Sequence, residues 1–160
     1  MAEEANGTFD AVILNARLLY GLFRKVPDTG ALAMVFVNVI APYILSCLLK
    51  QPKLLIFIAS VLHREAKTNV KDIFCFERGE RNSKISRHTD SKLNVMLLAD
   101  AVARRFNSTS VTAVHSGWVL NKIGRQSATD KLDDGVETYV IRVSPVYILN
   151  PERSLVNLFK

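Results

Sequence analysis

The sequence predicts a mainly α-helical chain with one small antiparallel β-hairpin, an α+β fold. Three observations support this prediction. Apolar residues recur at helical spacing in several segments, residues 97–124 are typical of two short helices joined by a polar turn, and a hairpin signal follows directly. The chain has 160 residues, of which 49% are hydrophobic, so it can bury a core and does not have the composition of a disordered segment.

Residues 1–50 are expected to form an N-terminal helical extension of two helices. Apolar side chains in residues 9–23 follow the i, i+3, i+4, i+7 pattern of an amphipathic helix, which the turn Val26–Gly30 (VPDTG) would end. Residues 29–49 then carry no charged side chain. Two interpretations stay open for this second helix: a helix buried by its neighbours, or a transmembrane helix with a basic cytoplasmic flank.

Residues 51–146 are expected to form the main domain. Pro52 suits the first turn of a helix that runs through about Ala66. A second helix would begin at Ser91 or Asn94 and end near Phe106.

A polar turn at residues 107–109 would lead into a third helix at Ser110–Ile123, which Gly124 would end. Strands at Arg125–Lys131 and Val136–Val143 would close a hairpin through an Asp-Gly turn at residues 133–135. Residues 147–160 would add a short C-terminal helix, because Asn150-Pro151-Glu152 is a helix-start signal.

The order helix, turn, helix and hairpin resembles the winged helix-turn-helix family, well over residues 97–143 and loosely over 52–146. The segment SGWVLNKIG at 116–124 is similar to the end of a recognition helix in that family. The resemblance implies a protein that binds duplex DNA as a dimer, as a transcription regulator or a chromosome-associated factor. It also implies an intracellular location, in the cytoplasm and nucleoid or in the nucleus, and membrane association stays open through residues 29–49.

The resemblance and the charge pattern together name the candidate DNA contacts. Most of the net charge of +6 falls in residues 50–93, where a basic segment could meet phosphates. The candidates for base reading on the recognition helix are Ser110, Thr112, His115, Asn121 and Lys122. The candidates for backbone contact are Arg78, Arg81, Lys84, Arg87, Arg104, Arg105 and Arg125.

Two features favour a different use of the same fold. The expected wing tip is acidic, at Asp130, Asp133, Asp134 and Glu137, and Trp118 makes the recognition face unusually apolar. The alternative is a protein-interaction module within a larger complex, with a homodimer or partner protein held through the N-terminal helices and the C-terminal helix. A third version tethers a DNA-binding protein to a membrane through residues 29–49.

Residue patterns typical of an enzyme are not recognised, so no enzymatic activity, cofactor, metal site or catalytic residue is expected. His63, His88 and His115 are scattered without metal-ligand spacing. Gly79 and Gly124 stand alone, which does not fit a glycine-rich phosphate loop.

Overall fold

The computed structural model describes residues 7–19, 24–67, 84–118, 128–131, 133 and 136–137. Three strands lie in one sheet: β1 (Ala11–Leu14), β2 (Leu54–Ile58) and β3 (Ser110–Val114). Their order in the sheet is β1-β2-β3, and both pairs are parallel. The register aligns Ala11 with Leu54 and Leu54 with Ser110, so the three strands begin together, and β1 ends one position before β2 and β3.

The composition of β2 explains its central place. All five of its residues, LLIFI, are buried, as expected for a parallel strand that is covered on both faces. The neighbouring β3 has the sequence SVTAV, whose β-branched Val and Thr side chains suit a pleated strand.

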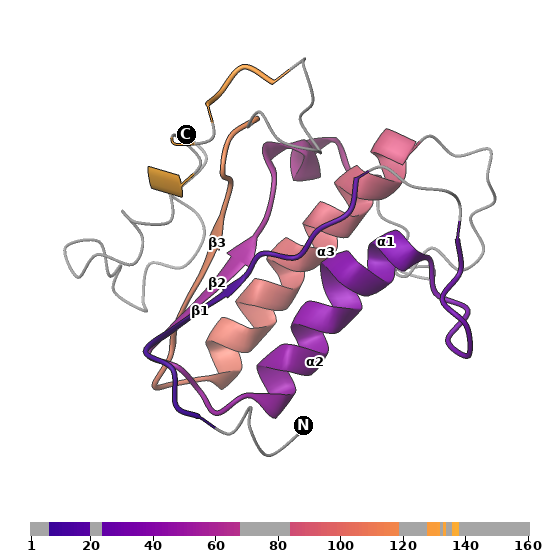
Figure 1. The fold of residues 1–160 in the computed structure, drawn as a ribbon. Coiled ribbons are helices and arrows are strands. Elements are labelled where there is room, and N and C mark those ends of the chain that lie inside the picture. Colours follow the sequence, from indigo (N-terminus) through magenta and orange to yellow (C-terminus); the bar gives the residue numbers. More distant parts are fainter. Residues whose placement is uncertain are drawn as a thin grey trace.

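The helices run beside the sheet (Figure 1). A continuous helical segment is made of α1 (Ala33–Val35), η2 (Phe36–Ile40) and α2 (Ala41–Leu48), and its middle part has π-helical geometry. The short 3₁₀ helix η3 (Val61–Glu65) follows β2, and the long α3 (Lys84–Arg105) precedes β3. Each parallel connection therefore passes through a helix, which is how parallel strands must be joined.

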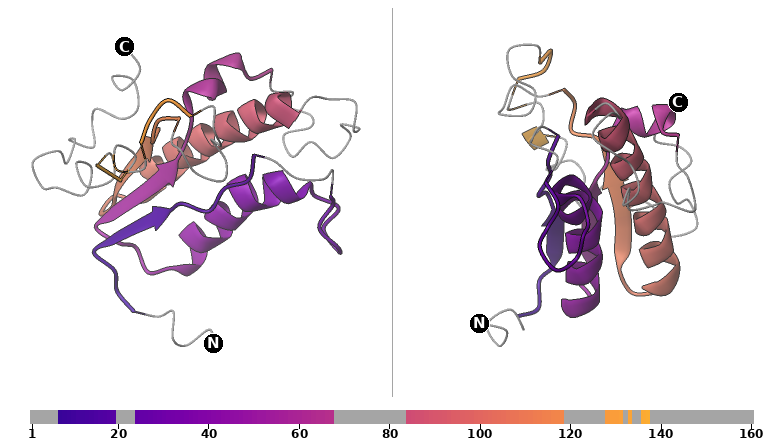
Figure 2. Two further views of the ribbon diagram at one scale, coloured as in Figure 1. Left: turned by 45° about the horizontal axis from the view of Figure 1, so that its top comes forward. Right: turned by 90° about the vertical axis from the view of Figure 1, so that its right-hand side faces the viewer.

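The core lies on two faces of the sheet, because side chains alternate along each strand. The cluster between the sheet and the helices contains Leu14, Val35, Val39, Leu55, Phe57, Val95, Ala99, Val102 and Ala113. The cluster on the opposite face contains Leu54, Ile56, Ile58 and Val114. Figure 2 shows α2 and α3 side by side along the same face.

The expected winged helix is wrong. The described sheet is parallel and links β1, from the expected helical extension, to β2 and β3 across the boundary drawn at residue 51. The helix expected over residues 9–23 contains β1, and the helix expected from Pro52 to Ala66 is β2 followed by η3. An uninterrupted apolar run fits both helical and strand spacing, so periodicity alone could not separate the two.

The recognition helix and the hairpin are also wrong in the described residues. β3 occupies the start of the segment expected to be the helix Ser110–Ile123. Val136 and Glu137 have helical backbone where a wing strand was expected, and most of the remaining hairpin lies outside the described residues. The C-terminal helix expected at 147–160 also lies outside them.

Two local predictions are confirmed. The turn at Val26–Gly30 is present, with the Gly30 amide donating to the Val26 carbonyl at 3.2 Å and Gly30 at φ 67°. The helix expected to end near Phe106 is α3, although its described part already begins at Lys84.

The uncharged stretch at 29–49 forms the helical segment Ala33–Leu48, whose Val35 and Val39 pack into the core beside the sheet. Among the residues that the structure describes, no helix has both the length and the apolar character needed to cross a bilayer. The structure thus shows this segment as a helix packed on a sheet.

Candidate functional site

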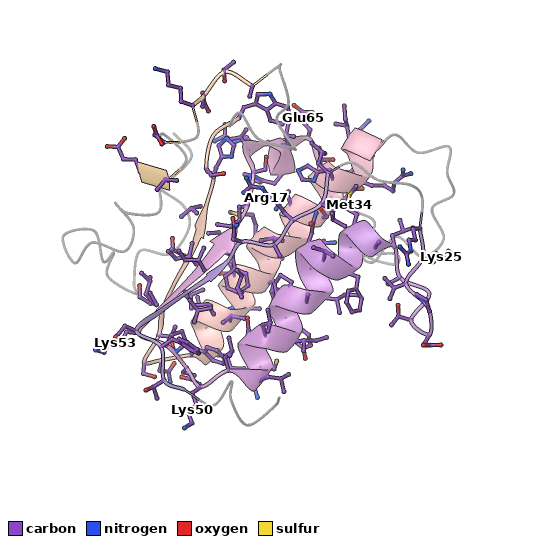
Figure 3. All side chains as sticks on the ribbon, in the orientation of Figure 1. Arg17, Lys25, Met34, Lys50, Lys53 and Glu65 are labelled. Atoms are coloured by element: carbon purple, nitrogen blue, oxygen red, sulfur yellow. The ribbon has the colours of Figure 1, made fainter. Side chains whose placement is uncertain are left out.

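Polar side chains gather beyond the carboxyl ends of the three strands. They come from the loop after β1, the residues after β2, the first half of α3 and the residues after β3. In Figure 3 Arg17 and Glu65 lie at this end, whereas Lys50 and Lys53 lie at the opposite end of the sheet. The carboxyl edge of an open parallel sheet is the general place where ligands bind in such folds.

Asn38 is the centre of a hydrogen-bond network. It lies in the π-helical segment η2 and is 2% exposed. Its Oδ1 accepts from the Leu18 amide at 2.7 Å, and its Nδ2 donates to the Leu18 carbonyl at 2.9 Å and to Ser91 Oγ at 3.0 Å. The amide therefore links the loop after β1 to the first half of α3, and π-helical segments are frequent at functional sites.

His88 lies on α3 and is buried, at 5% exposed. Its Nδ1 is 3.3 Å from the Leu18 carbonyl oxygen. Since a carbonyl only accepts, this contact assigns the proton to Nδ1 and leaves the lone pair on Nε2. Burial, together with the nearby charges of Lys92 and Arg17, lowers the pKa of His88 to about 4, so the ring is neutral at pH 7.

Lys92 lies one helical turn after His88 and is 2% exposed. Its Nζ donates to the carbonyl of Ile58, the last residue of β2, at 2.6 Å. Burial and the charge of Arg17 lower the pKa of Lys92 to about 7. Lys92 therefore changes its charge near neutral pH, which an ordinary lysine does not do.

The residues after β3 complete the cluster. Arg17 Nη1 donates to Ser116 Oγ at 3.3 Å, which joins the loop after β1 to the loop after β3. The pKa of His115 is lowered, first by burial, while the nearby carboxylate of Asp130 opposes the shift. Imidazoles, an ammonium and a guanidinium therefore share one end of the sheet.

A glycine is required where the chain leaves this cluster. Gly117 has φ 82°, and a Cβ there would overlap Asp130 Oδ2. The same carboxylate oxygen accepts from the Trp118 amide at 2.6 Å. The close approach lets Asp130 hold the turn directly after Ser116.

The two depressed pKa values predict how stability depends on pH. Between pH 7 and 10.5 for Lys92, and between pH 4 and 6.5 for His88, the unfolded chain binds more protons than the folded chain. Stability should therefore rise with pH through both windows, by on the order of 3–5 kcal/mol in each. Urea midpoints measured across pH should show this rise, and Lys92→Met should remove the upper part of it. An unchanged profile in that variant would contradict the assignment.

The described residues among the expected DNA contacts lie on different elements of the fold. Ser110 and Thr112 lie in β3, and Arg104 and Arg105 are exposed at the far end of α3, where Arg104 pairs with Asp100. Arg87 is buried at 6% exposed, and α3 begins at Lys84. Outside the described residues lie Arg78, Arg81, Asn121, Lys122 and Arg125. Of the candidates that the structure describes, His115 alone belongs to the polar cluster.

Ser60 follows β2 by two residues, is buried, and accepts from the Leu62 amide at 3.3 Å. Sequence reasoning missed it together with Arg17, Asn38, His88 and Lys92 of the cluster. Their one shared signal is position: each lies just after a short apolar strand segment or on a helix between two such segments. Reading LLIFI as a buried parallel strand would have placed Ser60 at its carboxyl end. Among the described residues, no group of three or more His, Cys, Asp or Glu could hold a metal ion.

Comparison with solved structures identifies the class of fold. The chain is similar to an uncharacterized protein from Mycobacterium paratuberculosis, with a TM-score of 0.68 and 18% identity over 89% of this chain and 53% of that one. It is also similar to the carbonyl reductase Sniffer of D. melanogaster, with a TM-score of 0.61 and 15% identity over 85% and 58%. At these identities the likeness shows the fold alone, that of a parallel α/β sheet rather than a winged helix.

Similar sequences carry more specific names. The chain is 66% identical over 144 residues to the short-chain dehydrogenase chyC of Penicillium rubens. The match covers 88% of this chain and 55% of the relative. It is 58% identical over 144 residues to the short-chain dehydrogenase chry4 of Gibberella zeae, with the same coverages. An uncharacterized oxidoreductase of Emericella nidulans is 35% identical over 139 residues, which are 83% of this chain and 51% of the relative. No protein-family model matches the chain.

These findings overturn the functional expectations drawn from the winged-helix resemblance. Proteins of up to 66% identity are named dehydrogenases, so the expectation of a DNA-binding protein and of duplex DNA as partner is wrong. The expectation that the chain is not an enzyme is wrong for the same reason, since its relatives are named dehydrogenases and an oxidoreductase. The chain spans about half the length of the curated relatives it matches.

Proposed function

We propose that the chain belongs to the short-chain dehydrogenases and carries the proton-transfer groups of an enzyme that oxidises an alcohol to a carbonyl compound. The observation that carries this proposal is the buried pair of His88 and Lys92 beyond the carboxyl ends of a parallel sheet. Buried titratable groups with strongly shifted pKa values in such a place are typical of active sites.

His88 is suited to act as the base. Its Nδ1–H is held by the Leu18 carbonyl, and Leu18 is held in turn by Asn38. The Nε2 lone pair can accept the hydroxyl proton of an alcohol. The hydrogen on the carbon that bears the hydroxyl group then leaves with its electron pair as a hydride. A pKa of about 4 keeps His88 in its basic form at neutral pH.

Lys92 is suited to receive that proton. With a pKa of about 7 against about 4 for His88, it is the more favourable place for the proton, and it lies one helical turn away. Its Nζ donates to the Ile58 carbonyl, which holds the amine at the end of β2. Turnover should therefore rise as pH rises through about 7, where Lys92 becomes neutral.

The hydride needs an acceptor, and in this class of fold a nicotinamide dinucleotide supplies that chemistry when bound. The fit of this chain to such a group is partial. The carboxyl edge of the sheet is the general place for it, but the 160 residues contain no glycine-rich phosphate fingerprint of the G-x-G-x-x-G type. We therefore assign no residue of the chain to the cofactor phosphates.

The proposal is tested with the full chain, a panel of primary and secondary alcohols, and NAD⁺ or NADP⁺. Nicotinamide mononucleotide serves as a second acceptor, because it needs no site for an adenosine. Alcohol-dependent formation of the dihydronicotinamide, absent without protein and increasing through about pH 7, is the expected result. No alcohol-dependent reduction of any acceptor, in a chain shown by circular dichroism to be folded, would contradict the proposal.

A further inference from the structure

The side chain of Arg17 crosses the carboxyl end of the sheet. Arg17 follows β1 by three residues, Ser116 follows β3 by two, and β2 lies between these two edge strands. The bond from Arg17 Nη1 to Ser116 Oγ, at 3.3 Å, therefore spans the place where β2 ends. Ile58, whose carbonyl holds Lys92, is the last residue of β2, so the guanidinium is close to the proposed reaction centre.

Arg17 and Lys92 bring positive charge to this end of the sheet. Neither Arg17 nor Lys92 has a carboxylate within ion-pair distance in the described part of the chain. Asp130, the acid that acts on His115, accepts hydrogen bonds from the Trp118 amide and from Thr129 Oγ1, and Asp90 on α3 accepts from the Lys67 amide. A guanidinium without a paired acid is costly in a partly buried site, and a bound anion would offset that cost.

The effect of Arg17 reaches several groups. Its charge contributes to the lowered pKa values of His88, Lys92 and His115, which come from α3 and from the loop after β3. His115 is also faced by Lys92 and His63, and Asp130 is the single acid that opposes them among the described groups. Repulsion from one guanidinium on three titratable groups indicates that its charge points into the cluster.

On this basis, and resting on the proposed dehydrogenase function, we infer that Arg17 and Ser116 form a subsite for a carboxylate of the substrate. A guanidinium offers two parallel N–H donors that match one carboxylate, and the Ser116 hydroxyl can add a third. Phosphate also matches a guanidinium, so inorganic phosphate enters the test as the competing anion. The substrate would then be a hydroxy acid or another alcohol that carries a carboxylate.

The test uses the full chain and three simple probes: benzoate, benzamide and inorganic phosphate. Binding is followed by the proton NMR signal of the His115 ring, whose pKa should rise when an anion screens Arg17. Benzoate should raise this pKa and benzamide, its neutral match, should not. Weaker binding of phosphate than of benzoate is expected, whereas stronger binding of phosphate would overturn the carboxylate assignment.

Variants then connect the effect to Arg17. Arg17→Gln should weaken benzoate binding roughly tenfold or more. Arg17→Lys should keep part of the binding, because lysine has the positive charge but lacks the two parallel N–H donors of a guanidinium. Arg24→Gln removes an exposed arginine outside the cluster and should leave benzoate binding unchanged. Equal binding of benzoate and benzamide by the unmodified chain would overturn the inference even if Arg17→Gln failed to fold. None of these measurements needs hydride transfer, so failure of the subsite and failure of the dehydrogenase activity are separate results.

Discussion

Replacing His88 with Gln is expected to lower alcohol oxidation by about 10²–10⁴-fold, the usual contribution of a positioned acid–base group. Glutamine can still donate an N–H to the Leu18 carbonyl, as His88 Nδ1 does, but it has no basic nitrogen to accept a proton. The loss should fall on kcat more than on KM, because the proton moves only in the reaction step. Steady-state kinetics with the best alcohol of the panel provide the measurement.

Two further observations separate a chemical role from a structural one. The melting temperature of His88→Gln should stay close to that of the unmodified chain, and the dependence of kcat on pH should change. Arg105→Gln, at the exposed far end of α3, is the matched surface control and should keep full turnover. A His88→Gln enzyme with the original kcat and the original pH profile would exclude His88 as the base.

Replacing Asn38 with Leu is expected to lower the free energy of unfolding by about 2–4 kcal/mol. Leucine has a similar size, but it leaves the Leu18 amide and carbonyl and Ser91 Oγ without the three bonds that Asn38 makes. A change of this size corresponds to a melting temperature lower by roughly 5–15 °C for a chain of this length. Thermal unfolding followed by circular dichroism measures it.

The comparison with Asn38→Asp shows whether the donors matter. This change keeps the shape and the acceptor but replaces Nδ2 by an oxygen that faces the Leu18 carbonyl, so the loss should be larger at neutral pH than near pH 4. Gln51→Ala, whose side chain makes one exposed bond to Ser108, should change stability by less than about 1 kcal/mol. Equal melting temperatures for Asn38→Leu and Gln51→Ala would show that the network does not stabilise the fold.

The sequence predicts local structure correctly where that structure depends only on residues adjacent in the chain. Val26–Gly30 combines a proline, an aspartate and a glycine, and these residue types select a turn whatever surrounds them. The second half of α3 is a similar case. Its apolar residues follow the helical period over more than ten residues, which fits a helix and does not fit a strand. Both predictions are confirmed for this reason.

Strand identity could not be decided locally. The run LLIFI at 54–58 is apolar at every position, so it matches a helix face and a buried strand equally well. It becomes a central strand because β1 and β3 supply hydrogen-bond partners on both sides. A short polar turn and a β-branched segment after a helix were consequently mistaken for a helix-turn-helix at residues 97–124.

By itself the sequence determined one local turn, the second half of one long helix and the need to bury several apolar runs. The tertiary structure alone decided that these runs pair in parallel, and so which polar residues meet at their carboxyl ends. Arg17, Asn38 and His88 are far apart in the chain, and no spacing relates them. They come together because parallel strands all end at the same edge, with α3 crossing beside them. Burial at that edge then shifts the pKa values of His88 and Lys92 that make proton transfer possible.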